Sequence, residues 1–152
     1  VDPVHTGDIV AVELNTDGAT APPSAEKAVI VYADRDILVV NKRAGMAMYE
    51  TYNHHGNALS NAVAAAGFDG PFRPIYRLDK DTSGLVVLAR HQLSAAKLAG
   101  RVQKDYYAVV PGTYTGSGTV DAPIAHCPDS TVKRCVDPAG VRAVTHWKAL
   151  GQ

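Results

Sequence analysis

Residues 76–90, which read YRLDKDTSGLVVLAR, are the most informative part of the sequence. Its second half, residues 85–89, is a run of five apolar residues between a glycine and an arginine, which is typical of a buried strand. Its first half is polar and follows a loop marked by two prolines. Loops held by a rigid strand often carry function. We therefore expect this stretch to supply both core residues and a site.

Further strands are predicted on both sides of this stretch. Two β-branched runs around a short polar loop, residues 29–32 and 37–42, predict a β-hairpin. Apolar runs predict later strands over residues 106–110 and 143–150, separated by a long loop rich in Gly, Pro and Asp. A turn glycine and an alternating pattern predict an early strand over residues 7–14.

Two helices are expected between these strands. The first is short, is capped by Asn57 or Ser60, and ends at Gly67. The second covers residues 91–103, where apolar residues recur at helical spacing and Gly100 weakens the pattern. Together the elements predict an α+β domain whose mixed, mostly antiparallel sheet carries a few flanking helices.

Composition limits the class of protein. The chain has 152 residues, 15 Lys and Arg against 15 Asp and Glu, and 46% apolar residues, which suits one globular domain. No apolar run reaches the length of a membrane span, and no secretion signal is visible. The two cysteines fit no disulfide framework, so we expect a cytoplasmic location. His126 beside Cys127 lacks the further ligands of a structural zinc, so no metal is expected.

Charge is unevenly distributed along the chain. Residues 1–36 contain seven acidic and two basic residues, whereas residues 73–104 contain seven basic and two acidic ones. The basic stretch could hold a phosphate backbone, and the alternative is a solvated helix face.

Asp79 is the candidate reactive group of the central stretch. Its neighbours Arg77 and Lys80 would favour the ionised carboxylate and prepare it for nucleophilic or base chemistry. An Asp in such a turn also commonly has a structural role only. A hydrolase that uses Asp79 with Asp81 ranks last, because nothing in the spacing makes the two side chains converge.

Three ordered blocks resemble the RluA-type pseudouridine synthases. Residues 76–90 closely resemble the family signature, His-Arg-Leu-Asp-x-x-Thr-Ser-Gly followed by an apolar strand. Residues 31–42 look like the family's opening hairpin, and residues 104–112 look like its Lys-x-Tyr-x-Ala strand. Residues 143–150 are similar to the strand that usually follows. The resemblance implies a pseudouridine synthase-like fold.

The resemblance also implies a reaction and its residues. It implies isomerisation of a specific uridine in ribosomal or transfer RNA, with Asp79 as the essential carboxylate and no metal or organic cofactor. Tyr106 matches the tyrosine that packs on the uracil, and Arg77 matches the residue that fills the place of the flipped base. Lys42 and Lys104 fit phosphate or ion-pair roles, with surface solvation as the alternative. The chain has Tyr76 where the signature has His.

The resemblance suggests a domain division. Residues 1–15 are similar to the tail of an S4-type RNA-binding domain, residues 16–28 form a linker, and residues 29–152 form the catalytic domain. The family continues past this point into a Thr-Gly-Arg-x-His-Gln-Ile-Arg segment, so the catalytic domain is expected to be incomplete at its C-terminal end. The alternative function is therefore an RNA-binding fragment or divergent homologue without activity.

Overall fold

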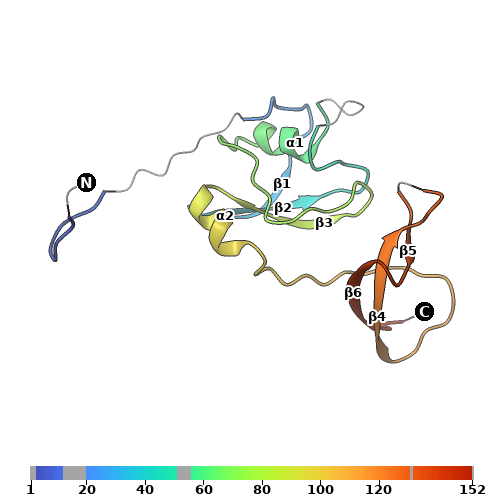
Figure 1. The fold of residues 1–152 in the computed structure, drawn as a ribbon. Helices are drawn as coiled ribbons and strands as arrows, with labels where there is room; N and C mark the ends of the chain where they lie inside the picture. The colour runs from blue at the N-terminus through green and yellow to red at the C-terminus, as the bar shows by residue number, and fades with distance from the viewer. Residues whose placement is uncertain (1–2, 12–19, 51–55, 131, 152) are drawn as a thin grey trace. The chain divides into compact units, whose positions relative to one another are not determined.

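A computed structural model describes residues 3–11, 20–50, 56–130 and 132–151 of the chain. The chain divides into two units, Val1–Lys104 and Asp105–Gln152, each with its own antiparallel sheet (Figure 1). Both helices lie in the first unit. The predicted α+β class with mostly antiparallel pairing is confirmed.

The first unit is built on three strands in the order β1-β2-β3: β1 (Val29–Ala33), β2 (Ile37–Lys42) and β3 (Gly84–Ala89). They confirm the predicted hairpin and the predicted buried strand. The turn between β1 and β2 forms because Asp34 Oδ1 accepts the N–H groups of Asp36 and Ile37, both at 2.7 Å. The polar loop seen in the sequence is thus a side-chain-stabilised turn.

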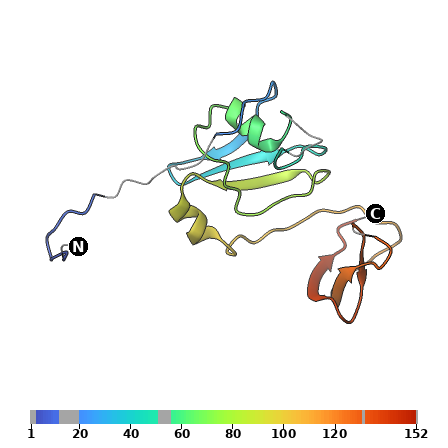
Figure 2. The same ribbon diagram turned by 45° about the horizontal axis from the view of Figure 1, so that its top comes forward.

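The core of this unit lies on one face of the sheet. Leu38 pairs with Leu88, and Val40 pairs with Val86, so period-two alternation puts all four side chains on that face. Helix α1 (Leu59–Ala65) covers the face (Figure 2). The buried cluster joins sheet, helix and loops through Leu38, Val40, Met46, Met48, Leu59, Ala62, Val63, Phe68, Leu78, Val86 and Leu88.

The start of α1 differs from the prediction. Its N-cap is Ala58, not Asn57 or Ser60. The first turn needs no cap side chain, because Asn61 reaches back and its Oδ1 accepts the Ala58 N–H at 3.0 Å. The predicted end is confirmed, since Gly67 follows the helix with φ +88°.

Helix α2 (Gln92–Leu98) is shorter than the predicted helix over residues 91–103. It begins after His91, whose Nδ1 accepts the Ser94 N–H at 3.2 Å. It ends early because Gly100 takes φ +69° and redirects the chain. Neither α1 nor α2, the two helices of the described segments, has the length and apolar content needed to cross a membrane.

The second unit contains β4 (Ser117–His126), β5 (Arg134–Val136) and β6 (Val141–Lys148), in the order β5-β4-β6. Strand β6 confirms the predicted strand over residues 143–150. The predicted long loop before it is wrong, because β4 and β5 occupy much of it. Strand β4 contains Gly, Asp and Pro, which are depleted in strands, so cross-strand pairing has overridden local propensity.

Two predicted strands are not found in the described residues. Residues 106–110 form no strand, and their side chains are exposed, with Val109 fully so. A strand needs a hydrogen-bonded neighbour, and the apolar pattern alone does not provide one. Residues 7–11 also form no strand, and the rest of that predicted strand lies outside the described residues.

Candidate active site

The segment that leads to Asp79 is paired to β3. The Ile75 N–H donates to Val87 O at 2.9 Å, and the Ala89 N–H donates to Arg73 O at 2.8 Å. These bonds align the segment antiparallel to β3, so the chain reaches Asp79 from a fixed position.

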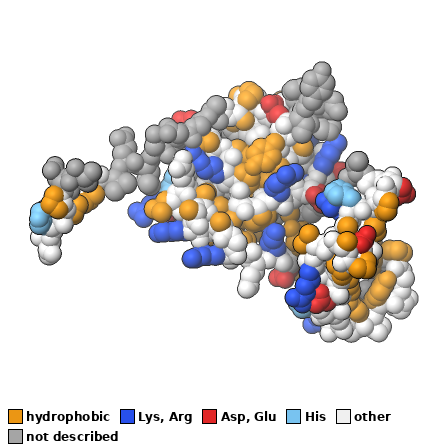
Figure 3. All heavy atoms as spheres, in the orientation of Figure 1, with side chains coloured by type: hydrophobic (Ala, Val, Ile, Leu, Met, Phe, Trp, Pro, Cys, Tyr) orange, Lys and Arg blue, Asp and Glu red, His pale blue; other side chains and the backbone are white. Residues whose placement is uncertain are grey.

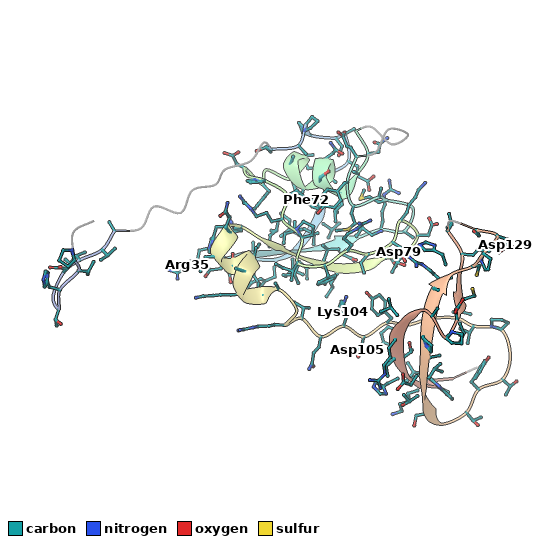
Figure 4. All side chains as sticks on the ribbon, in the orientation of Figure 1. Arg35, Phe72, Asp79, Lys104, Asp105 and Asp129 are labelled. Atoms are coloured by element: carbon teal, nitrogen blue, oxygen red, sulfur yellow. The ribbon has the colours of Figure 1, made fainter. Side chains whose placement is uncertain are left out.

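The turn at Asp79 is closed and anchored by its own residues. The Thr82 N–H donates to Asp79 O at 3.2 Å, and Leu78 is buried in the core of the first unit. Gly84 has φ +137°, a conformation that other residues rarely adopt, and it returns the chain into β3. Asp79 consequently lies at the end of the sheet where β3 begins (Figure 4).

The Asp79 side chain faces solvent. Asp79 is exposed, and its carboxylate makes no hydrogen bond or ion pair within the described segments. The sequence predicted support from Arg77 and Lys80; among the ion pairs of the described residues, none joins Arg77 to Asp79. Both carboxylate oxygens are therefore accessible to a ligand, on a backbone that is held in place.

Lys42 provides part of that hold. Its side chain is completely buried, and its Nζ donates to three backbone carbonyls, those of Met46 (2.9 Å), Lys80 (3.0 Å) and Arg43 (3.1 Å). The bond to Lys80 O joins the end of β2 to the turn that carries Asp79. The interpretations of Lys42 as a phosphate ligand or a solvated surface residue are wrong, because its ammonium group is fully engaged inside the protein.

The burial of Lys42 follows from its position in β2. It continues the alternation of buried residues along the strand and pairs with Gly84, which has no side chain to fill the space. Burial lowers the pKa of Lys42; the charges of Asp81 and Asp79 oppose this shift, and that of Arg43 adds to it. Sequence reasoning missed the burial of this residue, because the four consecutive apolar residues 37–40 do not show which face of the strand is buried.

Lys104 and Tyr76 lie together beside the turn. The Lys104 Nζ is 4.7 Å from the centroid of the Tyr76 ring, within the range of a cation–π interaction. The Tyr76 Oη donates to Leu85 O at 2.9 Å, which fixes the ring against β3. The Lys104 side chain, predicted to bind RNA, thus packs against Tyr76, which precedes Arg77 and Asp79 in the chain.

Tyr106 belongs to the second unit, whereas Asp79 belongs to the first. Alternation along the predicted strand over residues 106–110 would turn either Tyr106 or Tyr107 inward, but both are exposed, at 58% and 88%. The prediction is wrong within this unit, because the segment does not form a strand. A joint role of Tyr106 with Asp79 stays a prediction.

Asp36, His91 and Ser94 resemble a catalytic triad but form a helix cap. His91 Nε2 lies 2.8 Å from Asp36 Oδ1, while its Nδ1 already accepts the Ser94 N–H. The Ser94 Oγ is buried and donates to His91 O at 3.0 Å, so it is not available as a nucleophile. Bonds from His91 and Arg35 lower the pKa of Asp36. The group ties the β1–β2 turn to the start of α2.

The two thiols lie on the β4–β5 hairpin. Both Cys127 and Cys135 are free, and a hydrogen bond with Cys127 raises the pKa of Cys135. Over the part of the chain that the structure describes, no three His, Cys, Asp or Glu side chains gather as a metal site would require.

Sequence comparison relates the chain to known proteins. A family model described as RNA pseudouridylate synthase matches residues 36–152. The uncharacterized RNA pseudouridine synthase YjbO of Bacillus subtilis is 34% identical over 153 residues, which cover 93% of this chain and 54% of that protein. Ribosomal large subunit pseudouridine synthase D of Pseudomonas aeruginosa is 36% identical over 160 residues, which cover 98% and 50%. The chain spans about half the length of these relatives.

Solved structures support the fold. Human RNA pseudouridylate synthase domain containing 1 matches with a TM-score of 0.52 and 20% identity, over 82% of this chain and 51% of the human chain. Human RNA pseudouridylate synthase domain containing 4 matches with a TM-score of 0.52 and 19% identity, over 80% of this chain and 53% of the human chain.

Proposed function

We propose a function for this chain, which belongs to the RNA pseudouridylate synthase family. The proposed reaction is the isomerisation of uridine to pseudouridine in RNA, with Asp79 as the essential carboxylate and residues 29–152 as the catalytic part. The observation that carries the proposal is the exposed Asp79 carboxylate on a turn that the buried Lys42 holds in place.

The reaction rearranges atoms without adding or removing any. The bond between N1 and the sugar carbon breaks, the uracil turns, and a new bond joins C5 to the same carbon. The proton leaves C5, and N1 gains one. A carboxylate can serve this sequence as a nucleophile at the sugar or the base, or as a base toward a sugar proton. Asp79 has the accessible oxygen atoms that any of these roles requires.

The remaining site residues act on the RNA around the target. A stacked uridine is out of reach of a carboxylate, so the nucleotide must flip out of its helix or loop. Arg77 is exposed two residues from Asp79 and is proposed to occupy the vacated space. Lys104 is proposed to hold a phosphate, and Tyr106 to pack on the uracil and assist removal of the C5 proton.

Ribosomal RNA of the large subunit is the proposed substrate. The support is the name of the relative from Pseudomonas aeruginosa, which a second relative from Zymomonas mobilis shares. Transfer RNA is the alternative substrate, and the two are separated by where modification is found.

The test compares Asp79→Asn with Asp81→Asn, which removes the same charge from the same turn. Each variant is expressed in bacteria that lack their own large-subunit synthase, and pseudouridine is mapped by carbodiimide primer extension. We expect the wild type and Asp81→Asn to restore modification, and Asp79→Asn to restore none. With purified protein and RNA carrying tritium at C5 of uridine, we expect Asp79→Asn to slow tritium release at least about a thousandfold.

Two outcomes would contradict the proposal. Equal modification by the wild type and Asp79→Asn would remove Asp79 from the reaction, and equal loss in both variants would point to a two-carboxylate site. RNA binding by the wild type without any pseudouridine would favour the alternative, a binding protein without activity. The exposed basic residues between Asp81 and Asp105 support that alternative, because their positive charge favours binding to RNA whether or not a reaction follows.

A further inference from the structure

An acid-free basic stretch follows the turn that carries Asp79. Between Asp81 and Asp105 the chain contains four lysines and arginines and no acidic residue. The four are Arg90, Lys97, Arg101 and Lys104. A stretch of this kind keeps its positive charge unless acidic groups from elsewhere in the fold neutralise it.

Three of the four remain exposed and uncompensated. Lys97, Arg101 and Lys104 are exposed, and none has an ion pair with any described residue. We call these three residues the basic surface. Arg90 is different, because its Nη1 donates to Asp34 O at 2.9 Å and its guanidinium lies 5.6 Å from the centre of the Phe68 ring. Figure 3 shows Lys and Arg side chains gathered over this part of the first unit.

The backbone leads the basic surface toward the candidate site. Lys97 lies in the last turn of α2, and Gly100 then redirects the chain with φ +69°. The Arg101 N–H donates to Leu98 O at 3.0 Å, which holds this residue close to the helix end. Three residues later, Lys104 lies over the ring of Tyr76, beside the turn of Asp79. Cations therefore extend from α2 to the neighbourhood of the proposed reactive carboxylate.

We infer that the basic surface binds the phosphodiester backbone of the RNA flanking the nucleotide at Asp79. The inference rests on the proposed function and adds Lys97 and Arg101 to it. RNA carries one phosphate per nucleotide, and a row of uncompensated cations binds such a chain by releasing its counterions. Contacts of this kind position the strand and carry no sequence information, so they determine affinity and register and leave the choice of base to other residues.

The experiment measures equilibrium binding of the 152-residue chain to a fluorescent uridine-containing RNA oligonucleotide between 0.05 and 0.3 M salt, roughly the range in which counterion release is resolved. The test variant is Lys97→Ala with Arg101→Ala. The matched control is Lys133→Ala with Lys148→Ala, which removes two exposed lysines from the second unit. At 0.1 M salt, we expect the test pair to weaken binding about 25-fold, or roughly 5-fold per cation, and to flatten the slope of log K against log salt by about 1.4. The control should change either quantity much less.

The opposite results overturn the inference. These are equal weakening by both pairs, unchanged binding by the test pair, or no RNA binding by the wild-type chain at low salt. Because Lys97 also suits the end of a helix, thermal unfolding of each variant is measured. If the alanine pair unfolds, Lys97→Gln with Arg101→Gln replaces it, because glutamine removes the charge but keeps more of the aliphatic stem that packs on the surface.

These experiments distinguish loss of RNA binding from loss of catalysis. Asp79→Asn should bind the oligonucleotide as the wild type does while losing activity, whereas the test pair should lose affinity for reasons unrelated to Asp79. A wild type that binds through the basic surface but forms no pseudouridine would refute the proposed reaction and leave the basic surface supported.

Discussion

A buried ammonium group is costly unless acceptors replace the water it loses, and Lys42 meets that condition with three backbone carbonyls. One of the three belongs to Lys80, next to Asp79, so a side chain of the core holds the backbone of the exposed turn. The reactive group and the residue that holds it in place therefore have opposite environments. Asp79 is open to ligand, and Lys42 is closed to solvent.

Replacing Lys42 with Met should destabilise the first unit by about 2–4 kcal/mol, because the carbonyls lose their donor while the volume stays similar. The measurement is urea unfolding followed by far-ultraviolet circular dichroism. Lys27→Met is the control, since Lys27 is exposed, and it should change the free energy of unfolding little. A Lys42→Met protein as stable as the wild type would show that the three bonds contribute nothing net.

Among the elements, β1, β2, β3 and β6 were predictable from their residues, whereas β4 and β5 were not. The β-branched run of β2 and the apolar run of β3 are properties of the residues themselves. Strand β4 contains residues that favour loops, and it exists because β5 and β6 pair with it on both sides. Residues 106–110 show the reverse, a strand-like composition that finds no partner in the described structure.

Gly140, between β5 and β6, makes a close approach that the sheet of the second unit needs. A Cβ at this position would lie 2.6 Å from Ile124 O and 2.8 Å from Ala125 N, both backbone atoms of β4. Gly140→Ala should therefore destabilise the second unit by about 2 kcal/mol or more, because the backbone of β4 has to move. Gly151→Ala is the control, since a Cβ there meets nothing within 4 Å.

The fluorescence of Trp147 reports this unfolding directly. It is the only tryptophan in the sequence, and it lies in β6 opposite Gly118. Its transition should shift to lower urea in Gly140→Ala and stay unchanged in Gly151→Ala. Coincident transitions of the two variants would show that the close approach is not required.

At the scale of the whole molecule, two sheets form two units, and the family match spans parts of both. The charges balance overall, yet the three cations of the basic surface are exposed and have no ion pair with any described residue, whereas Glu26 and Asp121 are engaged in ion pairs and Asp34 in a turn. Net charge alone would have argued against a nucleic-acid partner, and the distribution argues for one.

Stability of the whole chain should fall in acid. Hydrogen bonds from Arg43, from the Ile37 and Asp36 N–H groups, from His91 and from Arg142 lower the pKa values of four carboxylates in the folded protein: Glu26, Asp34, Asp36 and Asp121. A lowered folded-state pKa contributes stability above the ordinary values of 3.8 and 4.5, and this contribution is lost as pH falls through the folded-state values.

The melting temperature should therefore be level from about pH 7 to pH 5 and should decline below about pH 4.5. The decline should be modest, because these groups are at the surface. Asp34→Asn keeps an acceptor for the turn but removes the titration, so its decline should be shallower than that of the wild type. A wild-type melting temperature that stays constant down to about pH 3 would contradict the assignment of these bonds.

The amino-acid sequence was enough to predict the α+β class, the hairpin, the buried strand and the family, because each depends on a local pattern or on an ordered motif. The tertiary structure decided what each side chain meets, since this depends on residues far apart in the chain. It placed Lys42 in the core against Lys80 O, set Lys104 on Tyr76, and made β4 a strand by pairing it with β6. The particular atoms that a buried or paired residue meets are a property of the assembled fold, and no local pattern contains them.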